Sequence, residues 1–206
     1  QASFFLALSL ILVFFSTCKK DDGECNTANV PTIEWQKTIG DNNDVAINDV
    51  QQTTDGGYIL AGNKITDLFF FDNWIAKLNS NADIEWEKTY GGSSADEAKS
   101  IQQTTDGGYI VIGSSRSNDG DVTNNNGGSD AWILKLNTNG DIEWQKIYGG
   151  SADDYFKSIK QTTDNGYITV GVTYSKDGDI PNNQGNFDAW IIKIDVNGNL
   201  EWSKTF

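Results

Sequence analysis

Three tandem copies of one motif fill most of this chain of 206 residues. Each copy holds an IEW tripeptide, a TTD turn that leads into a Gly-Tyr segment, and a DAW or DNW segment. A tandem repeat of this kind identifies a modular architecture before any single side chain is interpreted. The copies span 33–83, 84–141 and 142–199, and a fourth begins at 200–206. We therefore expect structural units that are stabilised mainly by contact with their neighbours.

All seven tryptophans fall at two positions of the repeat. The IEW or LEW position holds Trp35, Trp86, Trp144 and Trp202, and the DAW or DNW position holds Trp74, Trp132 and Trp190. Successive tryptophans of the first kind are 51, 58 and 58 residues apart. The whole difference falls in one connection, which ends at the DAW or DNW segment. A connection that varies in length while the rest is fixed indicates a loop on a packed scaffold.

Each copy contains four candidate strands, which in the middle of the chain are 101–105, 109–114, 131–137 and 142–148. Turns rich in Asp, Asn and Gly separate them, for example 106–108 and 139–141. These residue types readily take the positive φ angles that tight hairpins require. The pattern therefore predicts a four-stranded antiparallel meander in every copy.

The segment 131–137, AWILKLN, has Trp132, Leu134 and Leu136 on one face and Ile133 on the other. A strand that is apolar on both faces is covered on both sides. Four-stranded sheets that cover one another at this period describe a β-propeller. We predict an all-β fold over 32–206, with three blades plus one leftover strand in an incomplete ring. The tryptophans are expected to fill the space between successive blades.

The runs DGGYIVIGSS, NDGD and DAWILKLNTNGDIEWQKIYGGS also carry a family resemblance. They resemble the β-propeller repeat that occurs in tandem in secreted and surface proteins of Bacteroidota, over the range from Ile33 to Phe206. The resemblance implies a blade fold and a surface location rather than a particular activity. Because propellers close with about 4–8 blades, we expect the natural protein to continue beyond Phe206.

An apolar stretch, FFLALSLILVFF at 4–15, precedes the repeats. It is shorter than the roughly 20 residues of a membrane-spanning helix and fits the core of a signal peptide. The residues that follow resemble a bacterial lipobox, which implies a signal peptide over 1–17, lipid attachment at Cys18 and a polar tether over 18–31. An ordinary cleaved secretion signal is the alternative. We expect a lipid-anchored protein of the outer membrane or cell surface, or otherwise a secreted one. The first residue is Gln, and we expect the natural chain to begin earlier.

Composition excludes several classes of function. The net charge of −14 argues against nucleic acid as a partner, since a nucleic-acid-binding protein gathers Lys and Arg against phosphates. The sequence has no histidine, which removes Ser-His-Asp relays and imidazole chemistry. Arg116 is its sole arginine. These absences favour a protein that is not an enzyme.

Carboxylates in the two long loops suggest a metal. Oxygen ligands that alternate with Gly in a flexible loop suit Ca²⁺, which accepts six to eight of them. The same residues also form turns without a metal, so this interpretation stays open and no cofactor is assigned with certainty. The candidate ligands, for this metal or another ligand, are Asp119, Asp121, Asp130, Asp177, Asp179 and Asp188.

A second set of carboxylates follows the YGG tripeptides, at Asp96 and Glu97 and at Asp153 and Asp154. Paired carboxylates can perform the acid–base work of a glycosidase. Here they recur in successive copies, which favours a structural role, and we predict no catalytic residue in this chain.

These observations predict a non-enzymatic, surface-anchored propeller module that binds or scaffolds an extracellular glycan or protein. One alternative is a part of a secreted enzyme, resembling a glycoside hydrolase, whose catalytic residues lie in further blades. Another is a structural spacer.

Overall fold

The computed structural model describes residues 33, 35–40, 44–66 and 70–206. Cys18, the segment 1–17 and the tether 18–31 therefore lie outside the described residues. Within the described part, no helix is long and apolar enough to cross a membrane. Residues 37–206 form one compact unit, to which all the sheets below belong.

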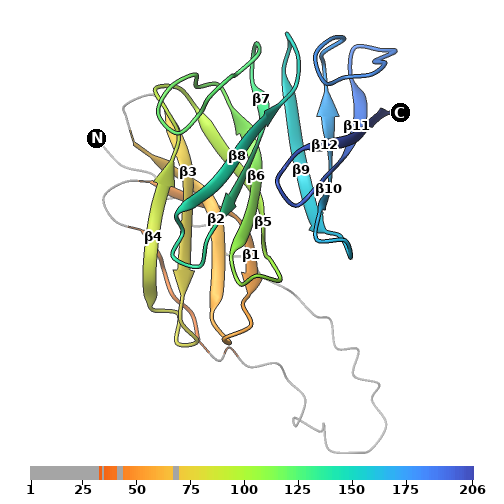
Figure 1. The fold of residues 1–206 in the computed structure, drawn as a ribbon. Coiled ribbons are helices and arrows are strands. Elements are labelled where there is room, and N and C mark those ends of the chain that lie inside the picture. Colours follow the sequence, from red (N-terminus) through yellow and green to blue (C-terminus); the bar gives the residue numbers. More distant parts are fainter. Residues whose placement is uncertain (1–32, 34, 41–43, 67–69) are drawn as a thin grey trace, which may run out of the picture. The chain divides into compact units, whose positions relative to one another are not determined.

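The described residues form three antiparallel sheets of four strands each, which we call the first, middle and third sheets (Figure 1). The first sheet contains β1 (Val45–Gln52), β2 (Tyr58–Ile65), β3 (Phe71–Leu78) and β4 (Ile84–Tyr90). The middle sheet contains β5 (Asp96–Gln103), β6 (Tyr109–Ser115), β7 (Asp130–Leu136) and β8 (Ile142–Tyr148). The third sheet contains β9 (Asp154–Gln161), β10 (Tyr167–Thr173), β11 (Asp188–Ile194) and β12 (Leu200–Thr205).

This architecture confirms the predicted all-β class with four-stranded antiparallel units, which do not close into a ring. The middle sheet contains all four strands expected there, although β5 begins at Asp96 rather than at residue 101. The segment 200–206 supplies β12, which pairs with β11 as the outer strand of the third sheet. The sheets are thus offset by one strand from the copies 33–83, 84–141 and 142–199. In each of the three sheets the IEW or LEW segment forms the last strand. A tight turn joins this strand to the preceding strand of the chain, and the two strands pair.

Tight turns fix the order of strands within each sheet. In the turn between β5 and β6, the N–H of Gly108 donates to Asp106 Oδ1 at 2.9 Å, and Gly107 takes a φ of 86°. In the turn between β7 and β8, Gly140 takes a φ of 78°. Glycine takes these left-handed angles without the penalty that a Cβ brings. The opposite end of the sheets carries the variable loops and the connections between sheets, and we call it the loop end.

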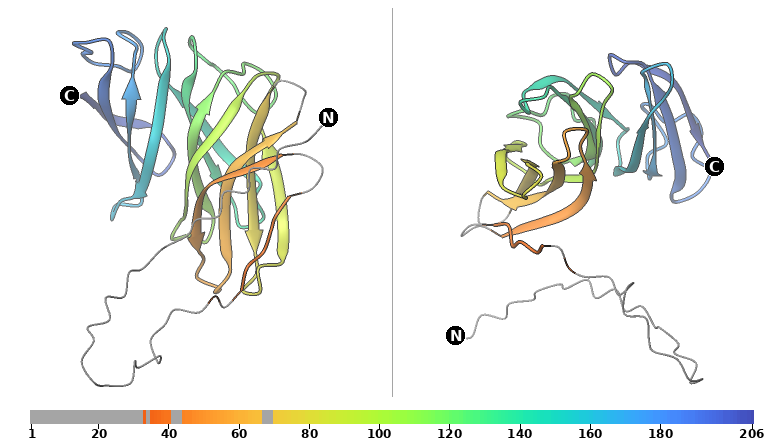
Figure 2. Two further views of the ribbon diagram at one scale, coloured as in Figure 1. Left: turned by 180° about the vertical axis from the view of Figure 1, so that it is seen from behind. Right: turned by 90° about the horizontal axis from the view of Figure 1, so that it is seen from below.

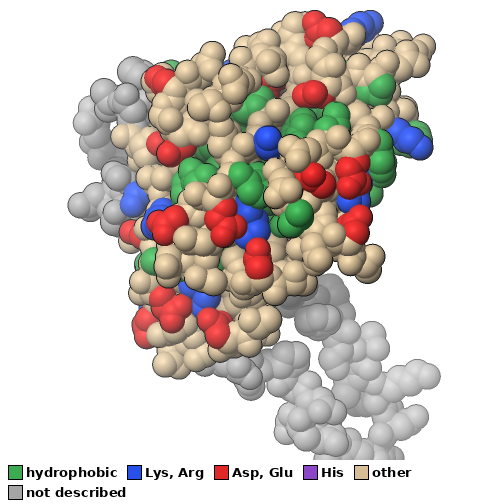
Figure 3. Space-filling view, viewed as in Figure 1, with side chains coloured by type: hydrophobic (Ala, Val, Ile, Leu, Met, Phe, Trp, Pro, Cys, Tyr) green, Lys and Arg blue, Asp and Glu red, His purple; other side chains and the backbone are tan. Residues whose placement is uncertain are grey.

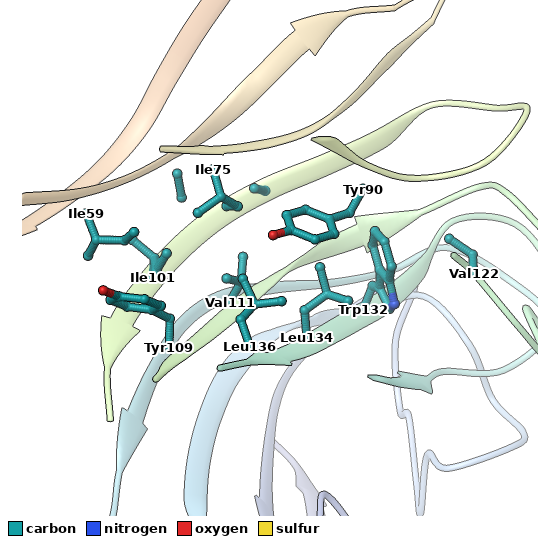
Figure 4. Packing of buried hydrophobic residues seen from close by; sticks show 12 residues of the cluster. Ile59, Ile75, Tyr90, Ile101, Tyr109, Val111, Val122, Trp132, Leu134 and Leu136 are labelled. Carbon is teal, nitrogen blue, oxygen red and sulfur yellow. The ribbon is translucent and has the colours of Figure 1, made fainter. Parts of the chain in front are cut away.

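The sheets pack in chain order, with the middle sheet between the other two (Figure 2). All residues of β6 and β7 are buried, as expected for strands covered on both faces. On one face Trp132, Leu134 and Leu136 of β7 pack in the same cluster as Ile59 and Ile75 of the first sheet (Figure 4). This cluster forms the junction between the first and middle sheets.

The other face of the middle sheet forms a second junction. Ile110, Ile112 and Ile133 belong to a cluster that also contains Phe156 and Trp190 of the third sheet. The rings of Phe156 and Trp190 are stacked, with centroids 4.9 Å apart. Ile133 therefore faces away from Trp132, as the alternation along a strand requires.

Two tryptophans of the IEW position reach from the last strand of one sheet to the next sheet. Trp86 of β4 meets Tyr109 edge to face at 5.9 Å and lies over Gly140 of the middle sheet's turn. Beside it, the hydroxyl of Tyr90 donates to the carbonyl oxygen of Gly140 at 2.5 Å. Trp144 repeats this arrangement on the third sheet. These contacts tie each sheet to the following one at the edge of the apolar clusters, against which Trp86 and Trp144 pack.

The other three tryptophans lie elsewhere. Trp74 is buried with Leu60 and Leu78 on the face of the first sheet that points away from the middle sheet. Trp202 of β12 is 40% exposed. Trp35 is 49% exposed and lies outside the compact unit.

Candidate functional site

Three carboxylates meet at the loop end where the middle and third sheets join. Asp130 begins β7, Asp154 begins β9, and Asp179 lies in the loop between β10 and β11. Asp179 Oδ2 accepts the N–H of Gly149 at 3.1 Å, and its own N–H donates to the carbonyl of Gly149 at 3.0 Å. Asp154 Oδ2 stands 2.7 Å from the point that a Cβ on Gly149 would occupy, and Asp130 Oδ1 stands closer still. We call these three carboxylates the second junction centre.

Two of these carboxylates are completely buried and only partly satisfied. Asp130 and Asp154 are both 0% exposed. Asp130 Oδ2 accepts the N–H of Asn126 at 2.5 Å, whereas Asp130 Oδ1 has no hydrogen-bond partner. Asp154 Oδ2 accepts from the N–H of Gly150 at 2.8 Å and the hydroxyl of Ser175 at 2.7 Å, whereas its Oδ1 has no partner. Buried acceptors without a partner lower the stability of a fold, so each needs a physical account.

The electrostatics of the second junction centre follow from this burial. Burial, helped by the negative charges of the neighbouring aspartates, raises the pKa of Asp130 to about 6 against the opposing hydrogen bond from the N–H of Asn126. The neighbouring aspartates are Asp154, Asp179 and Asp153. Burial also raises the pKa of Asp179. The centre is therefore stabilised by any positive species that enters it, whether a proton or a cation.

An equivalent centre, the first junction centre, lies between the first and middle sheets. Asp72 of β3, Asp96 of β5 and Asp121 surround Gly91, and Asp121 Oδ2 accepts the N–H of Gly91 at 3.2 Å. Asp72 Oδ1 and Asp96 Oδ2 stand 2.5 and 2.6 Å from the point that a Cβ on Gly91 would occupy. Asp72 Oδ1 is buried without a partner, but Asp96 Oδ1 accepts a hydrogen bond from the hydroxyl of Ser115. The two centres therefore have the same arrangement of carboxylates. They differ in how many of the buried carboxylate oxygens accept a hydrogen bond.

The structure regroups the carboxylates that the sequence placed in single loops. Asp121 belongs to the first junction centre, whereas Asp130 and Asp179 belong to the second. Within the part of the chain that the structure describes, no three acidic or thiol side chains form a ready-made metal site. The six residues predicted to bind calcium therefore do not form one site per loop, because three of them belong to the two centres and three lie elsewhere. The six residues are Asp119, Asp121, Asp130, Asp177, Asp179 and Asp188.

The three other candidates bind the backbone of the loops. Asp119 Oδ1 accepts the N–H of Ser93, and Asp177 Oδ1 accepts the N–H of Ser151, both at 2.7 Å. These hydrogen bonds lower the pKa of both carboxyl groups. Asp188 accepts a backbone N–H within its own loop at 2.8 Å. Each of these side chains therefore holds a loop in place.

Each centre also contains carboxylates outside the six predicted ligands. Asp96 and Asp154 were recognised as acidic residues after YGG and assigned a structural role, and Asp72 was not singled out. Their positions in the repeat could have identified them. Asp72 and Asp130 occupy one position of the repeat, and Asp96 and Asp154 occupy another. Residues from successive copies meet at one junction, and the sequence of one copy does not show this.

A cavity of about 410 Å³ opens at the same end of the sheets. Its walls come from all three sheets and combine aromatic rings, hydroxyls and two charged groups. Phe70, which is 38% exposed, lies in the short first-copy loop that departs most from the others. The lining residues are Phe70, Phe71, Ala95, Glu97, Ser114, Arg116, Ser129 and Tyr155.

Aromatic rings continue from the cavity over the third sheet. Tyr155 meets Tyr174 edge to face at 6.5 Å, and Tyr174 meets Phe187 at 5.5 Å. Tyr174 and Phe187 are 44% and 58% exposed. Exposed aromatic rings in contact with one another mark a surface suited to binding.

A buried lysine in each sheet accounts for another set of carboxylates. Lys135 Nζ lies 2.9 Å from Asp106 Oδ2 and 2.8 Å from Glu143 Oε2, and the same arrangement surrounds Lys77 and Lys193. The pKa of Lys193 is raised because its two carboxylate partners outweigh the opposing effect of burial. The Asp of the TTD turn therefore serves the fold in all three sheets.

Charges are otherwise mixed over the surface. On the face shown in Figure 3, acidic side chains are spread among the few Lys and Arg, and the basic side chains drawn there form no continuous patch. No family model matches the chain, and no curated protein is significantly similar to it.

Proposed function

We propose that this chain is a non-enzymatic binding module whose ligand, a glycan, occupies the aromatic cavity at the loop end. The observation that carries the proposal is the lining itself. Phe70, Phe71 and Tyr155 supply ring faces, while Glu97 and Arg116 supply charged hydrogen-bonding groups beside them. Binding sites are typically concave and largely apolar, with a few polar groups that fix orientation.

The chemistry of the lining favours a saccharide over a flat protein surface. A sugar ring offers C–H bonds that pack against an aromatic face and hydroxyls that bind carboxylate, guanidinium and serine groups. The aromatic row of Tyr155, Tyr174 and Phe187 extends this surface beyond the cavity, which suits a chain of several sugar units. A protein ligand remains an outcome that the experiment below distinguishes.

The absence of catalysis is part of the proposal. The carboxylates at the loop end recur at both junctions and bind backbone groups, as structural residues do. The cavity combines Glu97 with Arg116, and Glu97 is paired with Lys99. A hydrolase of the usual two-carboxylate kind needs a second acid at a set distance across the sugar, and the lining supplies a single acidic side chain.

The location of the module is proposed on the sequence alone. The apolar stretch at 4–15 and the lipobox-like residues before Cys18 support attachment by lipid to the outer membrane or cell surface. The resemblance to tandem blade repeats of Bacteroidota supports the same location. A lipid-anchored module would present its loop end to extracellular polymers.

Binding to an array of extracellular glycans tests the proposal. We expect the wild-type chain to retain a defined group of glycans, and Tyr155→Ala and Arg116→Gln to weaken binding at least tenfold, because each removes a cavity contact. Phe206→Ala is the matched control, since Phe206 is a 72% exposed aromatic residue outside the cavity. Its binding should equal that of the wild type.

Two results would contradict the proposal. One is equal binding by the cavity variants and the control, which would place the ligand elsewhere. The other is retention of a purified protein by the same surface with no glycan bound. Release of reducing sugar from a bound glycan would contradict the non-enzymatic part alone.

A further inference from the structure

The most unusual feature of the fold is the unpartnered oxygen of Asp130. This residue is 0% exposed, yet its Oδ1 has no hydrogen-bond donor and lies at Gly149 beside the carboxylate of Asp154. Asp154 is equally buried, and Asp179 approaches the same glycine. Burying several carboxylates together is costly unless a positive species joins them.

We propose that the second junction centre binds a calcium ion, with Asp130 and Asp154 as its buried ligands and Asp179 as a third. The metal would join the middle sheet to the third sheet, because Asp130 belongs to one and the other two belong to the next. This role is independent of the proposed glycan cavity, whose lining contains none of the three residues.

An open hollow of about 330 Å³ lies beside the centre, and of the three carboxylates Asp179 lines it. Gly149 and Asp179 line this hollow together with Asn126 and Asp177. Three carboxylates that each use one oxygen to accept a backbone N–H supply fewer oxygens than the six to eight that calcium accepts, so water from this hollow would complete the coordination shell. Calcium suits such a site because it accepts six to eight oxygens in flexible geometry, whereas Mg²⁺ requires a near-ideal octahedron.

The glycines explain how the carboxylates come together. A Cβ on Gly149 would overlap Asp130 Oδ1, and its φ of 156° lies in the positive range that residues with a side chain rarely adopt. Glycine is therefore needed here both for space and for its backbone angle. Gly91 gives the same space to Asp72 and Asp96 at the first junction.

The repetition supports a common purpose. Asp72 at the first junction and Asp130 at the second occupy equivalent positions of the repeat. In both residues the Oδ1 atom is buried and has no hydrogen-bond partner. Two equivalent atoms that are unsatisfied in the same way indicate a position built to be filled. Asp188 stands at the same repeat position in the third sheet and, among the described residues, has no following sheet to meet.

Calorimetric titration of the chelator-treated chain with CaCl₂, together with thermal melting, tests this proposal. We compare the wild type with Asp130→Asn and with Asp188→Asn, the matched control. We expect the wild type to bind Ca²⁺ with a Kd on the order of 10⁻⁴ to 10⁻³ M, as weak oxygen sites do. Asp130→Asn should lose one bound ion per chain, and Asp188→Asn should keep the wild-type number.

Melting temperatures separate a lost ligand from a lost fold. With chelator, Asp130→Asn should melt no lower than the wild type, because it removes a buried negative charge without changing shape. If it unfolds instead, Asp179→Asn serves as the second variant, since Asp179 is only partly buried. It should weaken Ca²⁺ binding at least tenfold.

The competing account is a proton held between Asp130 and Asp154. In that case millimolar Ca²⁺ would produce neither heat nor a shift in melting temperature of the wild type. An unchanged number of bound ions in Asp130→Asn would also overturn the proposal.

Discussion

The middle and third sheets have nearly the same sequence but different surroundings. Ile133 of β7 is 0% exposed, whereas Ile191 at the same position of β11 is partly exposed. Ile112 is likewise fully buried, and its equivalent Val170 is 39% exposed. The middle sheet is covered on both faces, and the third sheet is covered on one within the described residues. Burial in this fold is therefore set by the neighbouring sheet and not by the strand itself.

The same contrast holds for the tryptophans of the IEW or LEW position. Trp144 of the middle sheet packs on Tyr167 and on the turn at Gly198, whereas Trp202 at the equivalent position of the third sheet is 40% exposed. In a stack of repeats, stability is roughly the sum of the intrinsic stability of each unit and the contacts between neighbours. The predictions below separate these two contributions.

The largest effect is expected from removing the tryptophan at each junction. Trp132→Ala and Trp190→Ala should each lower the free energy of unfolding by about 3–5 kcal/mol, because each leaves a large cavity in a dry interface. Hydrogen exchange should distinguish them. Trp190→Ala should reduce protection in the third sheet and spare the first, whereas Trp132→Ala should expose the junction between the first and middle sheets.

Equal loss of protection across all three sheets in Trp190→Ala would show a single cooperative core. That result would end the description of the fold as sheets stabilised in series.

A matched pair of isoleucines gives the next effect. Ile133→Ala should cost about 2–5 kcal/mol, as expected for a fully buried side chain. Ile191→Ala should cost less than about half as much, since its side chain is already in partial contact with water. Urea denaturation of both variants measures the difference, and equal costs would mean that the exposed face of the third sheet is covered in solution.

Much of this fold could be predicted from the sequence because the repeat supplies the same signal several times. The turn at 106–108 indicates an antiparallel meander. The strand at 131–137, which is apolar on both faces, indicates a sheet that is packed on both faces. The length of the repeat does not show which of its strands begins each sheet. That depends on which strand each hairpin pairs with, and the tight turn at Gly140 assigns the IEW segment to the preceding sheet.

The junction centres were less predictable for a related reason. A loop that contains Asp119, Asp121 and Asp130 looks like one set of ligands when a single copy is considered. The fold places Asp121 and Asp130 on opposite junctions of the middle sheet, because residues on either side of the loop face different neighbours. Contacts between copies are a property of packing, and the spacing within one copy does not contain them.

The smallest effect compares Asp130 with Asp188, its equivalent in the third sheet. In the folded chain the pKa of Asp130 is raised to about 6 by burial and by the charges of Asp154 and Asp179, whereas the ordinary value is 3.8. A raised folded pKa means that the native state holds the proton more tightly than the unfolded state does. This contribution to stability is complete below about pH 4 and is lost as the pH rises through about 6.

Asp130→Asn removes this dependence, because the amide stays neutral. With chelator present, the variant should gain stability relative to the wild type by about 1–2 kcal/mol between pH 4 and 7, and the gain should level off above pH 7. Asp188→Asn is the matched variant, because no sheet among the described residues covers Asp188. Urea denaturation at several pH values measures both curves. Parallel curves for the two variants would mean that the third sheet does not desolvate Asp130, and the contrast between the two sheets would then be confined to their apolar faces.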